Sequence, residues 1–280
     1  MPHPHEENPH GIEALTALFR DGPVAVLTGA GVSTDSGIPD YRGAGTPPRT
    51  PMSISEFMHD EGYRRRFWAG ARVGFIRAAG VAPNAGHRAL ARLETAERIG
   101  GVITQNVDDL HRRGGSRTVV ELHGNGSVIR CVSCDRRWSR EEVLARFDEL
   151  NPGFATRNAD AEIAPDGDAR VADASRVTVP ACPVCGGVLR PAVVYFGETV
   201  PPRVFEAGEA LVRDASALLL AGTSLAVNTG MRLVHRAERR GIPIAVINRG
   251  PTAVDARDSV RVRIEGGTSE TLTALAERLG

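Results

Sequence analysis

The chain of 280 residues carries 34 basic and 34 acidic residues and therefore has no formal net charge. Its length allows one large domain with a smaller companion, or two modest domains. The charge balance argues against a general polyanion binder, which depends on a cationic face, and no apolar run approaches the ~20 residues of a membrane-spanning helix.

The N-terminal third begins with a tail and then alternates helix and strand. Residues 1–10 hold three histidines and three prolines and are expected to be disordered. Apolar residues at helical spacing predict a helix over 11–20, and the apolar run that follows predicts a buried strand over 24–28. Helices are expected over 53–79, where serines can cap them, and over 85–97, after a capping asparagine.

The rest of the chain continues the alternation, with one interruption. Short apolar runs predict strands over 101–104, 119–122, 217–220, 244–247 and 260–264. Apolar residues at helical spacing predict helices over 203–213, 228–240 and 268–279. Short apolar strands that alternate with helices are typical of a parallel, doubly wound α/β sheet. Residues 127–190 break this rhythm and are expected to form a small inserted module.

All four cysteines lie in the interrupting segment as two C-x-x-C pairs, Cys131 with Cys134 and Cys182 with Cys185. Each pair can hold one side of a tetrahedral metal, and four thiolates without histidine select Zn²⁺ in a closed, structural site. Two disulfides or four unrelated thiols are the alternatives. The chain shows no secretory signal, so a reducing, cytoplasmic location is expected, which favours zinc over disulfides.

The loop after the first strand begins like a turn that holds a dinucleotide pyrophosphate. Gly29, Ala30 and Gly31 supply the first two glycines of the fingerprint, but Thr34 stands in place of the third. A dehydrogenase places an acidic residue ~20 positions further on, at the end of a second strand. In this chain the corresponding region is rich in proline and is not predicted to form a strand. The loop therefore predicts dinucleotide binding for a purpose other than hydride transfer.

Polar residues also follow the other predicted strands. Gln105, Asn106 and Asp108 come directly after the strand over 101–104, and His123 follows the next strand. Two later strands are followed by the sequences GTSLAV and NRGPT. Because open α/β sheets bind ligands at the carboxyl ends of their strands, we expect these groups to share one crevice with the glycine loop.

Several motifs, in the same order, resemble the sirtuin family of NAD-dependent protein deacylases over residues 11–280. They are GAGVSTDSGIPDYR, TQNVDDLH, ELHG, the two C-x-x-C pairs, VVYFGE and GTSLAV. Finer features resemble the class II branch, among them Tyr41 in place of Phe, APDGD between the cysteine pairs, and INRGPT. The resemblance implies a Rossmann-like large domain, a small domain made of a zinc ribbon and a helical module, and a cleft for NAD and acyl-lysine.

The resemblance also assigns the parts of the chain. The Rossmann-like NAD-binding domain is expected to contain residues 11–43, 80–126 and 191–280. The helical module is expected over 44–79, and the zinc-binding module over 127–190. In such an enzyme NAD is not a redox carrier, because the bond between nicotinamide and ribose is broken and the acyl-lysine oxygen attacks the sugar from the opposite face.

Site residues are implied in the same way. His123 resembles the general base that accepts a proton from the ribose hydroxyls, and an ordinary imidazole pKa of ~6.5 suits that work. Asn106 would order the ribose and a water, while Asp108 would orient Asn106 or contact the nicotinamide amide. Further NAD contacts are expected from Gly29, Ala30, Gly31, Ser33, Asp40, Tyr41, Arg42, Gln105, Gly222, Thr223, Ser224, Asn248, Arg249 and Gly266. Two strands that sandwich the substrate peptide are expected at Val193, Val194, Phe196, Gly197, Leu225 and Ala226.

Three other functions compete with the deacylase interpretation. Mono-ADP-ribosyl transfer to a protein would use the same pocket and differ only in product. A zinc-ribbon protein that binds nucleic acid is disfavoured by the zero net charge, so the expected partners are acyl-lysine proteins and not nucleic acid or membrane. An NAD(P) oxidoreductase is disfavoured by the missing acidic residue.

One more feature of the resemblance predicts which acyl groups the enzyme removes. Sirtuins that remove succinyl groups carry a Tyr and an Arg, three apart, and the matching positions are Ala71 and Gly74. Neither can hold a carboxylate, although Arg72 and Arg77 lie nearby in the sequence. An unpaired carboxylate in an apolar tunnel is costly, so acetyl or longer neutral groups such as lipoyl are expected to be favoured over succinyl.

Overall fold

The computed structural model describes residues 9–40, 53–78, 81–159, 171 and 173–280. The chain divides into two compact units. Unit 1 consists of Met1–Gly37, Ala82–Leu122 and Val200–Gly280, and unit 2 of Ile38–Val81 and His123–Thr199. The expected disordered tail falls on residues 1–8, outside the described residues, and on the first two residues of a helix. Tyr41 and Arg42 also lie outside the described residues.

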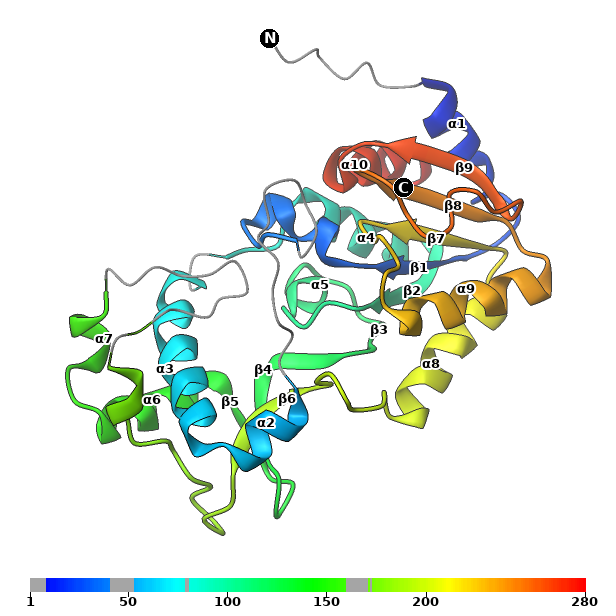
Figure 1. Cartoon of the computed structure of the whole chain (residues 1–280). Coiled ribbons are helices and arrows are strands. Elements are labelled where there is room, and N and C mark those ends of the chain that lie inside the picture. The colour runs from blue at the N-terminus through cyan, green and yellow to red at the C-terminus, as the bar shows by residue number, and fades with distance from the viewer. Residues whose placement is uncertain (1–8, 41–52, 79–80, 160–170, 172) are drawn as a thin grey trace. The chain divides into compact units, whose positions relative to one another are not determined.

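Unit 1 is built on a six-stranded parallel sheet with the order β3-β2-β1-β7-β8-β9 (Figure 1). The strands are β1 (Val24–Thr28), β2 (Ile99–Thr104), β3 (Val119–Glu121), β7 (Ala217–Ala221), β8 (Ile244–Asn248) and β9 (Val260–Glu265). The chain runs outward from β1 to β3, then returns to the other side of β1 and runs outward to β9. The strand order therefore reverses between β1 and β7, and the carboxyl ends of these two strands are the place where such sheets bind ligands.

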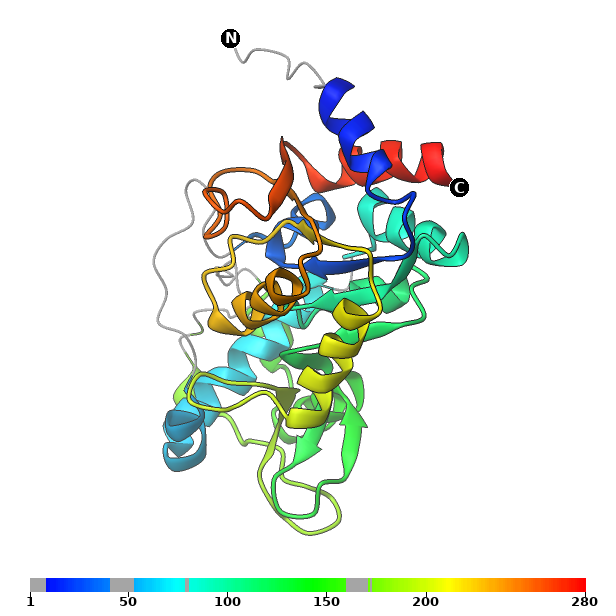
Figure 2. The ribbon, with the colours of Figure 1, turned by 90° about the vertical axis from the view of Figure 1, so that its right-hand side faces the viewer.

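Each face of this sheet is covered by its own helices, because both faces of a parallel sheet must be buried. On one face lie α1 (Pro9–Ala17), α4 (Ala85–Thr95) and α10 (Thr268–Leu279), and on the other α8 (Pro202–Arg213) and α9 (Asn228–Arg240). Figure 2 shows α1 beside α10. Alternate residues of β1 enter the two cores, since Val24 and Val26 belong to the first and Ala25 and Leu27 to the second. The doubly wound α/β fold is confirmed.

The elements of unit 1 follow the predicted pattern closely, but two helices end earlier than predicted. The first helix ends at Ala17 instead of residue 20, because the N–H groups of Leu18 and Phe19 bond to the carbonyls three residues earlier. The helix over 85–97 ends at Thr95, since Glu97 has a left-handed backbone with φ of 58°. Its N-cap is Asn84, as expected.

Unit 2 combines a small antiparallel sheet with helices (Figure 1). The sheet has the order β5-β4-β6, from β4 (Gly124–Cys131), β5 (Arg137–Ser139) and β6 (Leu189–Val193). The helices are α2 (Ile54–His59), α3 (Glu61–Ala78), α6 (Arg140–Leu150) and α7 (Phe154–Arg157). Its core is aromatic, because Phe57, Trp68, Phe147 and Phe154 are almost completely buried.

Short structural features complete the description. Helix α5 (Leu110–Arg113) follows β2, and single 3₁₀ turns cover Ala30–Val32, Thr34–Ser36 and Ala174–Arg176. The two helices expected over 53–79 are α2 and α3, and Ser53 caps the first by accepting the Glu56 N–H. None of the helices in the described part of the chain has both the length and the apolar character that a membrane crossing needs.

Candidate functional site

Two loops of unit 1 meet at the point where the strand order reverses. Gly31, after β1, donates its N–H to the carbonyl of Gly222, after β7, over 2.9 Å. A Cβ atom on Gly31 would lie 2.9 Å from Gly222 Cα, and one on Gly29 would lie 2.7 Å from Thr223 Cβ. Gly222 has φ of +62°, and a Cβ there would overlap the backbone nitrogen of Val32. Only glycine lets these backbones approach so closely.

A local turn explains why Thr34 can stand where the fingerprint has its third glycine. Thr34 begins a 3₁₀ turn and its Oγ1 donates to the carbonyl of Gly31 over 3.0 Å. Asn84 adds a further bond from Nδ2 to the carbonyl of Val32 over 2.7 Å, and Thr268 Oγ1 lies 3.3 Å from the same Gly31 carbonyl. The loop is thus held from three directions without a third glycine.

Ser33, Asn106 and Asp108 form one hydrogen-bonded group in unit 1. Ser33 Oγ donates to Asp108 Oδ2 over 2.7 Å, and Asn106 Nδ2 lies 3.2 Å from Ser33 Oγ and 3.1 Å from the carbonyl of Gly29. Asp108 Oδ1 accepts the N–H of Leu110 over 3.0 Å, which begins α5. Ser33 is only 1% exposed, so the group is rigid. The structure brings these three predicted residues together.

Gln105 connects the β2 loop to the β7 loop. Its N–H donates to the carbonyl of Thr28 over 3.0 Å, and its Nε2 donates to Thr223 Oγ1 over 2.9 Å. Thr223 Oγ1 also accepts the N–H of Leu225 over 3.2 Å. Leu225 is buried with a left-handed backbone, and it lies with Ala226 in the loop after β7 instead of a strand.

Two buried histidines that the sequence analysis did not single out lie within unit 1. His111 Nε2 is 2.9 Å from Thr28 Oγ1, and the ring centroids of His87 and His111 are 4.8 Å apart. Burial lowers the pKa of His87 to about 4, although Asp108 acts to raise it, and burial together with His87 lowers that of His111 to about 3. Both rings are therefore neutral near pH 7. The capping spacing Asn84–His87 was the available signal for the first.

The loop after β8 carries two of the predicted residues. Asn248 is buried and donates from Nδ2 to the carbonyls of Arg249 and Gly250, each over 3.0 Å. Arg249 is exposed. Gly266 donates its N–H to the carbonyl of Asn248 over 3.4 Å. The loop is therefore ordered by its own polar groups.

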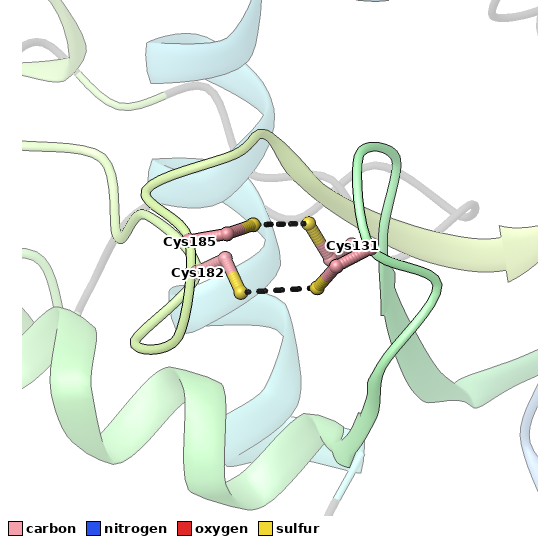
Figure 3. A group of neighbouring side chains, drawn as sticks. Cys131, Cys182 and Cys185 are labelled. Carbon is pink, nitrogen blue, oxygen red and sulfur yellow. Dashed lines mark hydrogen bonds between the residues drawn. The ribbon is translucent and has the colours of Figure 1, made fainter.

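In unit 2 the four cysteine sulfurs gather at one point, drawn in Figure 3. All four Sγ atoms lie within 4.8 Å of one another, with Cys131 and Cys185 3.5 Å apart and Cys134 and Cys182 3.8 Å apart. A tetrahedral Zn²⁺ with bonds of ~2.3 Å places sulfurs about 3.8 Å apart, whereas a disulfide needs ~2.05 Å. The cysteines are free thiols, so the geometry fits zinc and not the alternative of two disulfides.

Neighbouring groups of the knuckles also fit a thiolate cluster. The N–H of Ser133 donates to Cys131 Sγ over 3.3 Å, which favours the charged form of the sulfur. Gly187 follows the second knuckle, and a Cβ there would lie 2.8 Å from Cys131 Sγ. Only glycine therefore leaves room for the cluster.

His123 is the first residue of unit 2 and follows Leu122, whose N–H donates to the carbonyl of Thr104 over 2.9 Å. The carbonyl of His123 accepts the N–H of Val194 over 2.8 Å. Val193 ends β6, and the carbonyl of Phe196 accepts the N–H of Ile54 over 3.2 Å. The main chain of His123 is therefore fixed to the segment that carries the predicted substrate residues.

The segment after β6 is held by an ion pair between a buried arginine and a half-buried glutamate, which sequence reasoning missed. Arg190 is 4% exposed and donates to both Glu198 oxygens over 2.7 and 2.6 Å and to the carbonyl of Val193 over 2.7 Å. Its guanidinium lies 4.5 Å from the ring centroid of Tyr195. This pair fixes the turn that presents Phe196, whose side chain is 57% exposed, and Gly197, with φ of +92°.

Comparison with known proteins places these features in a family. The family model described as Sir2 family matches residues 29–229. NAD-dependent protein deacetylase 1 of Mycobacterium avium is 47% identical over 268 residues, covering 95% of this chain and 94% of its own length. NAD-dependent protein deacylase SIR4 of Monosiga brevicollis is 40% identical, covering 96% and 89%. A solved structure, Sir2-p53 peptide-NAD+, aligns with a TM-score of 0.75 at 30% identity and covers 95% of this chain and 98% of its own.

Proposed function

The chain belongs to the Sir2 family, and from this premise we propose that it is an NAD-dependent protein lysine deacylase that releases nicotinamide and forms O-acyl-ADP-ribose. The observation that carries the proposal is the Ser33–Asn106–Asp108 group, which lies beside the glycine loop where the strand order of the sheet reverses. All three residues fall in the matched region.

The glycine loop would hold the NAD pyrophosphate through backbone N–H groups, since it is shaped for close approach. Thr223 and Ser224 would add polar contacts from the β7 loop, and Gln105 would reach the ribose from β2. Asn248 and Arg249 would contact the adenosine ribose. Bound NAD would supply an ADP-ribosyl group to accept the acyl chain, with nicotinamide as the leaving group. Ala30, Asp40, Tyr41, Arg42, Gly222 and Gly266 complete the proposed contacts.

Asn106 and Asp108 would orient the reacting groups. The Nδ2 atom of Asn106 is committed to the carbonyl of Gly29 and to Ser33 Oγ, so its Oδ1 is turned the other way and can accept from a water or a ribose hydroxyl. Asp108 fixes Ser33 through a bond of 2.7 Å and so fixes Asn106. Polar groups that are fixed in advance stabilise developing charge without reorganising.

His123 would act as the general base that takes a proton from the ribose hydroxyls. Its main chain is fixed on both sides, because Leu122 is bonded to Thr104 and the His123 carbonyl is bonded to Val194. Such anchoring holds a catalytic side chain in place during the reaction.

The acyl-lysine peptide would bind to the main chain of the segment Val193–Gly197. Arg190 holds this segment through the Val193 carbonyl, and Phe196 is exposed. Leu225 and Ala226 are proposed as further peptide contacts from unit 1. Recognition of this kind reads backbone more than side chains. We also propose that Zn²⁺, held by the four thiolates, only stabilises unit 2, because a four-thiolate site is closed. Free thiols favour a cytoplasmic location, with acyl-lysine proteins as partners and no role for nucleic acid or membrane.

The test is a stoichiometry measurement with NAD and an acetyl-lysine peptide. The expected result is one nicotinamide released for each lysine freed, with no absorbance from reduced NAD. The chain itself contains no lysine, so every acyl-lysine in the assay belongs to the peptide. Nicotinamide release without a freed lysine, and with ADP-ribose attached to protein, would instead support mono-ADP-ribosyl transfer and contradict the proposal.

A further inference from the structure

One arginine of the edge strand β9 uses its whole guanidinium to hold the loop after β8. A guanidinium has five N–H donors and no acceptor. Arg263 Nε donates to Asp255 Oδ1 over 3.1 Å, Nη1 donates to the carbonyls of Asn248 over 3.0 Å and Ile264 over 2.6 Å, and Nη2 donates to the carbonyl of Gly250 over 2.7 Å and to Glu265 Oε2 over 2.8 Å. The five acceptors therefore match the five donors one for one.

Further bonds lock the same loop. Glu265 Oε1 accepts the N–H of Gly250 over 2.6 Å, and Asn248 Nδ2 donates to the carbonyls of Arg249 and Gly250. The carbonyls of Asn248, Arg249 and Gly250 all point into this network. The three consecutive peptide groups at the start of the loop are therefore fixed.

The far end of the loop is held through the same arginine. The carboxylate of Asp255 accepts from Arg263. It also accepts a hydrogen bond from the Thr252 N–H over 2.8 Å and one from the Thr252 hydroxyl, Oγ1, over 2.5 Å. The N–H of Ala253 donates to the carbonyl of Ser224 over 3.1 Å, which connects the loop to the one after β7. Arg263 thus joins the two ends of the segment 248–255.

The loop fixed by this network also carries the side chain of Arg249, which takes no part in the network. Arg249 is exposed, and a Cβ atom on Gly267 would lie 2.8 Å from Arg249 Nη2. Gly267 is the N-cap of α10, so Arg249 lies across the beginning of that helix. Fixing the Arg249 main chain therefore fixes where its long side chain starts.

We propose that Arg263 is a positioning residue that orders the segment 248–255 in advance for the adenosine half of NAD. The inference rests on the proposed function, because it takes Asn248 and Arg249 as adenosine contacts. Fixing a residue's backbone costs conformational entropy, and a loop that is already ordered does not meet that cost when the ligand binds. Arg263 itself touches no nucleotide in this account.

The experiment uses the full chain with zinc bound and compares three variants. Arg263→Met removes the donors and keeps an unbranched stem, while Arg263→Lys keeps the charge but offers only three donors from one point. Arg261→Met, on the same strand and exposed, is the matched control. ADP-ribose binding is measured by calorimetry, and the KM values for NAD and for acyl peptide are measured separately from kcat.

Both Arg263 variants are expected to weaken ADP-ribose binding and to raise the NAD KM about tenfold, which corresponds to ~1.4 kcal/mol. The peptide KM, and kcat at saturating NAD, should change less than twofold, and Arg261→Met should match the wild type. Arg263→Lys should not rescue binding, because one ammonium cannot reach three carbonyls and two carboxylates together. Thermal unfolding shows whether each variant is folded.

If Arg263→Met fails to fold, Glu265→Gln serves in its place and should weaken ADP-ribose binding about threefold. Unchanged ADP-ribose affinity in folded variants would overturn the inference, as would equal changes in kcat and in both KM values. Failure of both variants to fold would assign Arg263 to stability alone and also overturn it. A wild-type chain that binds ADP-ribose but deacylates nothing would contradict the proposed function and leave this inference standing.

Discussion

The two units reach order by different means. In unit 1, every residue of β1, β7 and β8 is buried, and helices cover both faces of the sheet. In unit 2, the described sheet has only three strands, and the order comes from two cysteine knuckles, an aromatic core and the Arg190–Glu198 pair. A metal site and charge-assisted hydrogen bonds add stability where the apolar packing is not built on a large buried sheet.

This difference determines which substitutions should affect folding and which should affect activity in each unit. Unit 1 carries its polar site on loops at strand ends, so a site residue can change while the core remains. In unit 2, the proposed peptide-binding segment after β6 is held by the same Arg190–Glu198 interactions that stabilise the unit. Changes in the cysteine knuckles or in the Arg190–Glu198 pair are therefore expected to affect fold and function at once. Changes in the loops of unit 1, or in a side chain such as His123 that lies outside these interactions, are expected to affect function first.

Loss of the metal should have the largest effect. Cys131→Ser removes one of four thiolates, and structural zinc sites contribute roughly 10–16 kcal/mol of apparent binding energy to folding. We expect zinc content to fall from one ion per chain, unit 2 to lose its structure, and deacylation to stop. Metal analysis and circular dichroism check this. Well-folded, active protein without zinc would contradict both the metal assignment and the contrast between the units.

Substitution of the proposed base should come next. His123→Ala is expected to lower kcat/KM by roughly 10²–10⁴, the usual contribution of a general base. Nicotinamide release from NAD and acyl peptide measures it. Zinc content and the unfolding temperature should stay near the wild-type values, since only the side chain is removed and the main-chain bond to Val194 is kept. Wild-type turnover would remove His123 from the mechanism.

Asn106→Ala tests the loops of unit 1. The variant loses the bonds to Gly29 and Ser33, so the group that we propose orients water and ribose is no longer held. We expect kcat to fall roughly 10²-fold, comparable to the loss of one positioned donor at an active site. The unfolding temperature should change little. A large loss of stability with modest loss of rate would show that unit 1 does not separate site from core.

Glu198→Gln tests the ion pair of unit 2. Burial acts to raise the pKa of Glu198, but bonds from Arg190 and from the Tyr195 N–H outweigh it and lower the pKa below its usual 4.5. A lowered folded-state pKa stabilises the protein above the unfolded-state value, and this stabilisation is lost as pH falls through the folded-state pKa. The variant should be less stable by roughly 1–3 kcal/mol at pH 7, with a smaller difference at pH 4.

Unfolding temperatures at the two pH values measure this effect. Asp214→Asn, in an ion pair with Arg213 whose side chains are 69% and 67% exposed, is the matched control and should change almost nothing. A Glu198→Gln difference that stays constant from pH 7 to pH 4 would show that the charge of Glu198 does not stabilise unit 2.

Acyl choice should show the smallest response to mutation. Arg72 donates to both oxygens of Asp148 over 2.7 Å, which ties α3 to α6 and leaves it committed within unit 2. Ala71 and Gly74 are buried on α3. We expect kcat/KM for acetyl or lipoyl lysine to exceed that for succinyl lysine at least tenfold, and Arg72→Ala to leave this ratio unchanged. A succinyl preference lost in Arg72→Ala would contradict it.

The sequence predicted the sheet well because apolar strand runs and helical spacing are local signals. The predicted strand over 24–28 is β1 without change, and Asn84 caps α4 as expected. The paired cysteines predicted a metal cluster because their spacing is itself the geometry of a knuckle.

The residues that were missed act over long sequence separations. Arg190 and Arg263 look like ordinary arginines in the sequence, and only the folded chain shows that each guanidinium bonds to carbonyls of a segment that belongs to the proposed site. No local pattern indicated that the buried rings of His87 and His111 lie together, with centroids 4.8 Å apart. No local pattern distinguishes such a residue from a solvated one, because its partners are set by the fold.

The most direct test of the whole account is mass spectrometry of the acyl product formed from NAD and an acyl-lysine peptide. We expect O-acyl-ADP-ribose, in equal amount to the nicotinamide released and the lysine freed. We also expect this product to disappear in His123→Ala, while zinc and fold remain. Release of the acyl group as a free carboxylate without NAD cleavage, or ADP-ribose attached to a protein with the acyl-lysine intact, would contradict it.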